Sequence, residues 1–449
     1  MCHCFLYPCS SCVDPCRKWT GTPVETGAGT VAHNLCSSIF ISGLPEKETY
    51  DELVGGLIGP ARLLVRYHID RSAKTVDASM LLAHAHAVFT PGYGCRLTYS
   101  GDNPLPVPDA RIEASATDSF APSAAVQTQN PALKAALDEA FEGAGAKKRH
   151  IKAVVIVKDG RVVAERYAPG FGVDTSVMSF SVAKSVTNAL LGILVRQGKV
   201  SMYAPAPVAE WQDANDPRAH ITPDNLLRME SGLDAAETGS GFDPSSHMLY
   251  DSSNMGAFAA RRPLKIPLAT RWEYTSVDTL LLDRMMSQLI GGGPAEFRRF
   301  AETELFDPIG MKNVTLEFDG AGTFVGSSHV YAPARAFARL GQLFLNDGVG
   351  PDGRRILPAG WAAYSRKSTL GSNYGAGFWT NDGPSEGAAW RAAHGFPKDG
   401  YFASGDLGQR IYIVPSQNLV IARFGYTEGR NFGIEADVKL IAATISALR

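Results

Sequence analysis

Two hairpin patterns lie far apart in this 449-residue chain, and they constrain its fold more than any other feature. Residues 153–157 (AVVIV) and 161–165 (RVVAE) flank an Asp-Gly turn, and residues 409–414 (QRIYIV) and 419–424 (LVIARF) flank a second turn. Runs of β-branched residues around a short turn are typical of antiparallel hairpins. The long segment between them has helical periodicity. The sequence therefore predicts an α+β fold, in which one antiparallel sheet built from two distant parts of the chain is flanked by helices, with an all-helical subdomain beside it.

The N-terminal part is predicted to be an appendage to this fold. Residues 34–101 contain a helical stretch and several alternating segments, which indicates a small N-terminal α/β extension. Residues 102–130 are polar and rich in proline, serine and alanine, a composition typical of a linker. We therefore divide the chain into a cysteine-rich tail (1–33) that we expect to be disordered, the small unit (34–101), the linker (102–130) and one large domain (131–449).

Charge and hydropathy exclude several classes of partner. The chain has 43 basic and 45 acidic residues and a formal net charge of −2, so it lacks the basic excess that binds nucleic acid or an anionic membrane. No apolar run reaches the length of about eighteen residues that predicts a transmembrane helix. The first twenty residues lack the basic and apolar regions of a signal peptide. We expect a small molecule as the partner, and the oligomeric state stays open.

Cysteine is distributed unevenly. Five of the seven cysteines lie in the first sixteen residues and none follows Cys95, so thiolate chemistry is excluded from the large domain. Cys9 and Cys12 form a CxxC, but a structural zinc site usually pairs two such motifs, so we expect no metal there. Cys36 and Cys95 are the two cysteines outside that cluster, and we hypothesise a disulfide between them. That hypothesis favours a periplasmic or secreted location over the cytoplasm.

The strongest chemical signal is Ser181-Val-Ala-Lys184. Apolar residues recur from Ala183 and Val186 onward at helical spacing, and Gly198 is placed to stop the helix. Ser181 and Lys184 then stand on the same face of the first turn. A serine hydroxyl becomes a nucleophile when a base removes its proton, and a lysine is such a base where burial lowers its pKa. A helix start with a solvated lysine is the plain alternative, because SxxK is frequent by chance.

Further segments follow SxxK in a fixed order: residues 226–233 (LLRMESGL), 271–276 (RWEYTS), 338–342 (ARLGQ) and 405–409 (GDLGQ). With these segments and the preceding hairpin, residues 130–449 resemble the serine hydrolases related to class C β-lactamases. This group includes D-alanyl-D-alanine peptidases, family VIII carboxylesterases and 6-aminohexanoate-dimer hydrolases, and the N-terminal region resembles the extension of bacterial esterase-like members. The resemblance implies a β-lactamase/transpeptidase-like fold and chemistry that requires neither a metal nor an organic cofactor.

The resemblance also supplies a third catalytic residue. Tyr274-Thr275-Ser276 matches the YxN or YxS motif of the group, whose tyrosine lies against the Ser/Lys pair. A phenol near an ammonium is stabilised as phenolate, so Lys184 and Tyr274 are expected to share the proton transfer. A core aromatic beside Trp272 is the alternative interpretation of Tyr274. Ser276 stands where true β-lactamases have asparagine, which argues against efficient β-lactam turnover.

The Lys-Thr-Gly motif of β-lactamases is replaced by Ser404-Gly405-Asp406. We expect this segment to pass Ser181, where one of its backbone N–H groups and that of Ser181 form an oxyanion hole. Glycine permits the close approach. The missing lysine removes the charge that would hold a substrate carboxylate. For Asp406 two roles stay open, since it either binds a substrate ammonium or caps a turn.

These residues together predict a serine hydrolase that cleaves carboxylic esters through an acyl-enzyme. The predicted site consists of Ser181 as nucleophile, Lys184 and Tyr274 as the base, and four oxyanion or substrate-binding residues, Ser276, Ser404, Gly405 and Asp406. Amides of the 6-aminohexanoate-oligomer type are the next substrates, followed by β-lactams or D-alanyl-D-alanine peptides. A silent cell-wall-binding homologue is the non-enzymatic alternative, which the intact Ser/Lys/Tyr set disfavours.

Other residues carry weaker signals. Trp379, Tyr250 and His394 are candidates for the pocket wall. The remaining candidates are better explained by structure: a histidine pair on one strand, a set of turn aspartates and a helix-stopping glycine run (His84 and His86; Asp213, Asp216 and Asp224; residues 291–293).

Overall fold

The computed structural model describes residues 23–449 except 103, 106–119, 121 and 430. The cysteine cluster of the first sixteen residues, with its CxxC, and the central part of the expected linker therefore lie outside the described residues. Within the described ranges, none of the helices combines the length and apolar character needed to cross a membrane.

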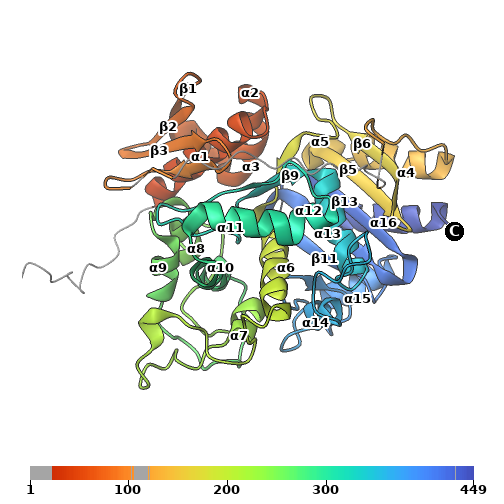
Figure 1. Cartoon of the computed structure of the whole chain (residues 1–449). Coiled ribbons are helices and arrows are strands. Elements are labelled where there is room, and N and C mark those ends of the chain that lie inside the picture. The colour runs from red at the N-terminus through yellow and green to blue at the C-terminus, as the bar shows by residue number, and fades with distance from the viewer. Residues whose placement is uncertain (1–22, 103, 106–119, 121, 430) are drawn as a thin grey trace, which may run out of the picture.

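The main sheet joins the two ends of the large domain, as the hairpin patterns predict. Its six antiparallel strands run in the order β10-β11-β12-β13-β5-β6, and β13 pairs with β5 through neighbours such as Val420 and Val157. In Figure 1 the yellow strands β5 and β6 lie beside the blue strand β13. The α+β prediction is thus confirmed. The strand bounds are β5 Ile151–Lys158, β6 Arg161–Tyr167, β10 Trp379–Thr380, β11 Tyr401–Gly405, β12 Gln409–Val414 and β13 Leu419–Gly425.

Helices cover both faces of this sheet, which explains why its strands are at least half-buried at nearly every position. Along β5, Val154 and Ile156 point into a core shared with α4 (Pro131–Glu142) and α16 (Ile434–Ala447). Val155 and Val157 alternate with them and belong to the larger core on the opposite face, where α13 (Ala334–Leu345) packs against β12 and β13. Successive side chains of a strand point to opposite faces, so each strand serves two cores.

Along the chain, the helical subdomain lies between the β5–β6 hairpin and the β12–β13 hairpin. Its central helix α6 (Ala183–Arg196) is buried from Ala183 to Leu194. Gly198, two residues after the end of the helix, has a positive φ of 71°, as expected for a helix stop. A three-stranded sheet, β7-β9-β8, lies beside the start of this helix. The other elements here are α7 Pro223–Arg228, α8 Pro244–Tyr250, α9 Met255–Ala260, α10 Ser276–Ile290, α11 Gly293–Ala301, α12 Asp307–Ile309, α14 Trp361–Arg366, α15 Glu386–Ala393, β7 Ser176–Met178, β8 Thr315–Leu316 and β9 Val330–Pro333.

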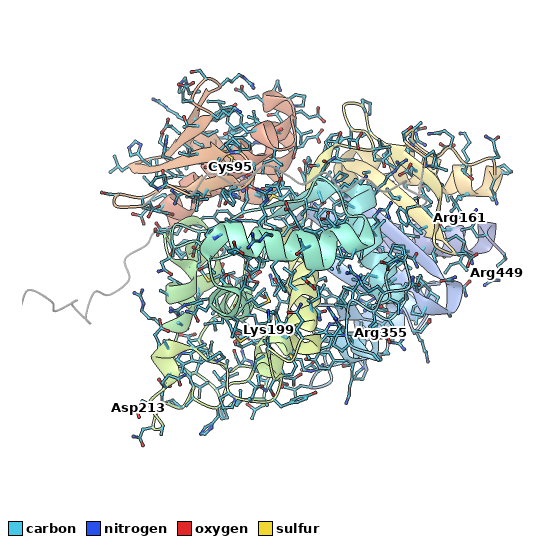
Figure 2. All side chains as sticks on the ribbon, in the orientation of Figure 1. Cys95, Arg161, Lys199, Asp213, Arg355 and Arg449 are labelled. Atoms are coloured by element: carbon cyan, nitrogen blue, oxygen red, sulfur yellow. A yellow bond between two sulfur atoms is a disulfide. The ribbon has the colours of Figure 1, made fainter. Side chains whose placement is uncertain are left out.

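The N-terminal unit is a four-stranded antiparallel sheet, β1-β2-β3-β4, with helix α1 (Pro23–Phe40) packed against it. A disulfide between Cys36 and Cys95 joins α1 to β4, so the disulfide hypothesis is confirmed (Figure 2). In the chain-entropy model a crosslink that closes a loop of this size stabilises the fold by about 4 kcal/mol. The strands are β1 Val65–Asp70, β2 Thr75–Met80, β3 Ala83–Thr90 and β4 Gly94–Leu97, and the short helices α2 Glu46–Glu48 and α3 Gly55–Ile58 precede them.

The expectation of a disordered tail through residue 33 is wrong for residues 23–33, which form the first half of α1. This helix is buried on all sides between its own sheet and α8, so its sequence lacks an amphipathic stripe. Gly29 shows how close the contact is, because a Cβ there would lie 2.0 Å from the backbone oxygen of Tyr250 on α8. The red α1 region indeed sits directly against the green helices in Figure 1.

The described end of the expected linker, residues 122–130, lies along the outer strand of the main sheet. The N–H of Glu165 on β6 donates to the carbonyl of Val126, and Arg335 donates to the carbonyls of Pro122 and Ala124. These contacts cover an otherwise open sheet edge.

Candidate active site

Ser181 lies in a short 3₁₀ turn, Phe180–Val182, that leads directly into α6. Phe180 has a positive φ of 43°, an unfavourable conformation for a non-glycine residue. Its buried ring packs in a cluster with Tyr331 and Leu407, which holds this backbone in place. The turn projects the side chain of Ser181 into a cavity at the N-terminal end of α6.

Lys184 follows one turn later, and its Nζ lies at the centre of a set of oxygen atoms. Lys184 Nζ is 3.1 Å from Ser181 Oγ, 3.0 Å from Ser276 Oγ and 3.0 Å from the carbonyl oxygen of Ser327. The residue is 2% exposed. Burial lowers the pKa of Lys184, and the more distant carboxylates of Glu237 and Asp283 oppose this effect only in part. The structure thus excludes the solvated lysine of the plain alternative.

Tyr274 lies on the other side of the Ser/Lys pair, just before α10. Its hydroxyl hydrogen-bonds with Ser181, and its ring centroid is 4.9 Å from Lys184 Nζ. Burial raises the pKa of Tyr274 well above its usual value, and the hydrogen bond to Ser181 offsets this only in part. The electrostatics therefore differ from the phenolate expected from the sequence: the phenol keeps its proton, and a neutral Lys184 is the stronger base.

An aromatic cluster fixes the Tyr274 ring. Tyr274 stacks on Trp379 at a centroid distance of 5.6 Å and meets Tyr374 edge-on at the same distance. Trp272 also contacts both Tyr374 and Trp379. Tyr274 is therefore a member of an aromatic cluster and a neighbour of the nucleophile at once, so the two interpretations of this residue do not exclude one another.

The end of β11 passes the nucleophile turn at close range. A Cβ at Gly405 would lie 2.3 Å from the carbonyl oxygen of Ser179 and 3.1 Å from Phe180 Cβ, so glycine is needed here. Ser404, Gly405 and Asp406 all line the cavity that holds Ser181. The structure brings together the seven residues of the predicted site, while the oxyanion hole itself stays a prediction.

Asp406 both caps a turn and faces the cavity. Its Oδ1 accepts the N–H of Leu407 at 2.8 Å, and the side chain lines the cavity beside Ser181. Burial raises the pKa of Asp406, and the charge of Glu237 raises it further.

Glu237 is a site residue that the sequence did not reveal. It lies in an irregular loop, and its Oε2 accepts the N–H of Ser276 at 2.6 Å. Nothing in the local pattern around residue 237 signals this role, because the loop acquires its position from contacts with α10.

The cavity measures about 700 Å³ and is lined from both parts of the molecule. The catalytic domain supplies Ser181, Tyr274 and the expected walls Trp379 and Tyr250. The opposite wall belongs to the N-terminal unit and is largely aliphatic: Val24, Leu57, Ile58, Ala61, Leu64 and Met80. Treating the N-terminal unit as a separate appendage missed this contribution.

The remaining sequence candidates are explained by local structure. His394 stacks on Trp390 at 4.2 Å, and His86 pairs with Asp77 on the neighbouring strand at 2.7 Å. Asp213 and Asp216 accept backbone N–H groups in turns, whereas Asp224 lies in the first turn of α7 and pairs with Arg228 at 3.1 Å; Asp213 is far from the N-terminal unit in Figure 2. Gly291 follows the last residue of α10 with a positive φ of 74°.

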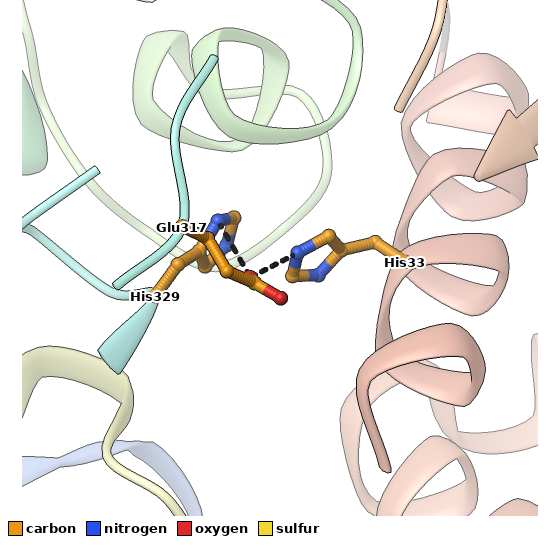
Figure 3. Close-up of side chains that lie close together, drawn as sticks. All are labelled: His33, Glu317 and His329. Atoms are coloured by element: carbon orange, nitrogen blue, oxygen red, sulfur yellow. Dashed lines mark hydrogen bonds and ion pairs between the residues drawn. The ribbon is translucent and has the colours of Figure 1, made fainter. Parts of the chain in front are cut away.

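A second polar cluster lies where the N-terminal unit meets the catalytic domain (Figure 3). Glu317 is fully buried, and its carboxylate accepts hydrogen bonds from His33 Nε2 at 2.7 Å, Ser37 Oγ at 2.8 Å and the Cys95 N–H at 2.7 Å. His329 Nδ1 lies 3.7 Å from the same carboxylate.

His33, Glu317 and His329 are the residue types of a metal site, and their ligand atoms lie within 4.8 Å of one another. The two imidazoles, however, are stacked 4.0 Å apart at 23°, whereas rings that bind one ion diverge from it. The arrangement fits a hydrogen-bonded link between the two parts of the molecule.

The fold and this site define a serine hydrolase of the β-lactamase fold. The Beta-lactamase family model matches residues 137–444, and the chain belongs to that family. A curated 6-aminohexanoate-dimer hydrolase from Paenarthrobacter ureafaciens is 23% identical over 293 residues, which cover 60% of this chain and 71% of that protein.

Solved structures share the fold at lower identity. A family VIII carboxylesterase superposes with a TM-score of 0.55 at 14% identity, covering 72% of this chain and 98% of its own. A penicillin-binding protein homologue from Caulobacter crescentus superposes with a TM-score of 0.54 at 18% identity, covering 72% and 98%. These neighbours confirm the β-lactamase/transpeptidase-like fold.

Proposed function

We propose that this protein hydrolyses carboxylic esters through an acyl-enzyme on Ser181. One observation carries the proposal: a buried Lys184 amine lies 3.1 Å from the Ser181 hydroxyl. A desolvated amine with a lowered pKa is a base at moderate pH, and it is within hydrogen-bond reach of the proton that it must remove.

The proposed reaction runs in two halves. Lys184 accepts the Ser181 proton as Oγ attacks the carbonyl carbon, and backbone N–H groups of Ser181 and the Gly405 segment hold the oxyanion. Tyr274 protonates the departing alkoxide and recovers a proton from Lys184, which leaves the acyl group on Ser181. Water then attacks the acyl-enzyme, the same groups carry its proton, and the carboxylic acid leaves.

The charges in the cavity favour a substrate without a carboxylate near the scissile bond. Glu237 and Asp406 are the charged residues of the described lining, and no lysine or arginine belongs to that lining. A substrate carboxylate would meet two carboxyl groups and no basic side chain in this lining. This argues for neutral esters over β-lactams and peptides that end in a free carboxylate.

Hydrolysis of amides is the second candidate. The curated relative from Paenarthrobacter ureafaciens is named for an amide dimer, and the same Ser/Lys/Tyr set serves acyl transfer from either leaving group.

Active-site labelling tests the proposal. A fluorophosphonate probe should label the wild type and the Ser181→Ala variant should not react. Ser185→Ala is the matched control, since Ser185 lies on the same helix and donates to the carbonyl of Gly377 away from the cavity. Equal labelling of wild type and Ser181→Ala would refute the site.

Substrate class is tested separately. Turnover of p-nitrophenyl esters should exceed that of nitrocefin in kcat/KM, and preferential turnover of nitrocefin would contradict the ester assignment. A wild type that neither reacts with the probe nor turns over any ester or amide would support the silent-homologue alternative.

A further inference from the structure

Large apolar side chains are exposed to solvent around the mouth of the active-site cavity. Five of the eight large apolar residues that are prominently exposed in the described part of the chain lie there. Leu64 and Phe242 line the cavity mouth, and Leu63, Leu81 and Leu82 are chain neighbours of the lining residues Leu64 and Met80. We call these five residues the apolar rim: Leu63, 84% exposed, Leu64, 53%, Leu81, 64%, Leu82, 94%, and Phe242, 69%.

The strand register brings four of the five together. Val65 pairs with Met80 across β1 and β2, and Met80 pairs with Ala83 across β2 and β3. Leu63 and Leu64 therefore end next to the turn formed by Leu81 and Leu82. Phe242 approaches from the catalytic domain in the same loop as Gly241, whose Cβ would lie 3.9 Å from Pro23 at the start of α1.

The Leu81-Leu82 turn is unfavourable in water. In a two-residue hairpin turn whose first residue has a positive φ and whose second does not, glycine is the usual first residue. Here Leu81 has a φ of 55°, and both side chains point into solvent. The turn thus combines backbone strain with exposed apolar surface, and contacts with an apolar medium would offset both costs.

The rim is continuous with the aliphatic wall of the cavity. Met80 packs in one apolar cluster with Val24, Ile58 and Ala61, and Leu57 packs in the cluster of Phe180, the residue before Ser181. A hydrocarbon chain can therefore reach the nucleophile from the rim along apolar contacts. Such a path suits a substrate whose hydrocarbon chain starts in an apolar phase outside the protein.

Charges next to the rim fit a lipid headgroup layer. Residues 61–66 (ARLLVR) and 79–84 (SMLLAH) contain two arginines and no carboxylate, and residues 239–242 (GSGF) contain no charge. Arg66 is exposed beside the leucines. Arginines that flank exposed leucines suit phosphate groups above an acyl-chain layer.

We propose that the apolar rim docks on a lipid surface and that the substrate is an ester with a long acyl or alkyl chain held in that surface. The substrate class rests on the proposed ester hydrolysis, whereas the docking does not. The docking uses apolar contact and so needs none of the overall basic charge that this chain lacks.

Vesicle flotation with the full chain tests the docking. The probes are vesicles of phosphatidylcholine alone and with one third phosphatidylglycerol. The Leu81→Gly/Leu82→Asn double variant places glycine at the position with positive φ, so it removes two rim side chains while favouring the fold. Leu370→Asn is the matched control, because Leu370 is 51% exposed with a φ of 47° and lies outside the rim.

The wild type and Leu370→Asn should float with both vesicle types, and the double variant should bind at least tenfold more weakly. A wild type that stays unbound, or a double variant that binds as well as the wild type, would overturn the proposal. A rim-dependent dimer in sedimentation velocity without vesicle binding would also overturn it, because a second copy would then be the occupant.

Kinetics separate the docking from the catalytic proposal. The double variant should hydrolyse soluble p-nitrophenyl acetate within twofold of the wild type and lose at least tenfold on a long-chain ester embedded in vesicles. Equal loss on both substrates would contradict the role of the rim. If Ser181 proves unreactive, flotation still decides the docking by itself.

Discussion

At the scale of single residues, the chemistry depends on what burial does to Lys184 and Tyr274. Both side chains lose water, and this has opposite consequences for an amine and a phenol. The charged form is disfavoured in each case, so the pKa of Lys184 falls and the pKa of Tyr274 rises. Burial thus shifts Lys184 toward the neutral amine and Tyr274 toward the neutral phenol beside Ser181.

The lowered pKa of Lys184 predicts the pH dependence of activity. The neutral amine is the active form, so kcat/KM should rise with pH and level off at a pKa below the ordinary lysine value of 10.5. Lys184→Arg keeps its charge at all accessible pH values, and its kcat/KM should fall by about 10³ or more. A pH profile with p-nitrophenyl butyrate measures both effects. A flat profile in the wild type would contradict Lys184 as the base.

Tyr274 as proton donor predicts a dependence on the leaving group. Tyr274→Phe keeps the ring that stacks on Trp379, so the fold should persist. Alkyl esters need a proton on the departing alkoxide, and their kcat should fall by about 10²–10⁴. p-Nitrophenolate leaves without being protonated, so kcat for the p-nitrophenyl ester should fall far less. A comparison of ethyl and p-nitrophenyl butyrate measures the difference, and equal losses would argue for a purely structural Tyr274.

At the scale of elements, α10 and the segment before it place Tyr274 beside Ser181. Thr275 caps α10 by accepting the N–H of Val277, which fixes Tyr274 one residue upstream. Residues 226–233 (LLRMESGL) contact the first turn of the same helix, where Ser231 Oγ donates a hydrogen bond to Asp278 Oδ1 at 2.8 Å. The order of these motifs in the sequence thus corresponds to direct contacts around the site.

Asp278 predicts how pH affects stability. Burial raises its pKa to about 8 from an ordinary 3.8, so the folded state holds a proton that the unfolded state has lost at neutral pH. Its stabilising contribution is complete below about pH 4 and is lost as pH rises toward 8. The side chain introduced by Asp278→Asn does not titrate. Between pH 5 and 8 the free energy of unfolding of this variant should therefore increase by more than about 1.4 kcal/mol relative to that of the wild type. Urea unfolding measures this, with Asp213→Asn as the control that should follow the wild type.

At the scale of the whole molecule, the N-terminal unit completes the active site. Its aliphatic wall faces Ser181 across the cavity, and the cluster around Glu317 ties it to the catalytic domain. The disulfide adds a covalent link within the unit itself.

Glu317→Ala should therefore affect both stability and substrate selection. Three buried donors would lose their acceptor, which should lower the free energy of unfolding by about 2–5 kcal/mol. Loosening of the wall should raise KM for p-nitrophenyl octanoate more than for the acetate. Asp77→Ala breaks the exposed pair with His86 and should cost at most about 1 kcal/mol. Equal KM changes for both esters would contradict a role of the unit in binding the chain.

The sequence by itself determined the elements and motifs that depend on local pattern. The hairpins, α6 and the SxxK motif follow from residue spacing along the backbone, because strand and helix periodicity are properties of short segments. The YxS motif follows from the resemblance to β-lactamase-related hydrolases. The Cys36–Cys95 pair followed from elimination. Six of the seven predicted site residues line one cavity, and the seventh, Lys184, contacts Ser181 from behind it, as the order of the motifs predicts.

Only the tertiary structure decided which distant surfaces meet. Residues 23–33 read as a tail because a helix buried on all sides has no amphipathic period. Glu237, the link of His33 with Glu317 and His329, and the aliphatic wall acquire their roles from contacts between segments far apart in the chain. The apolar rim has the same origin, since four leucines become one surface only when strand pairing places their loops side by side.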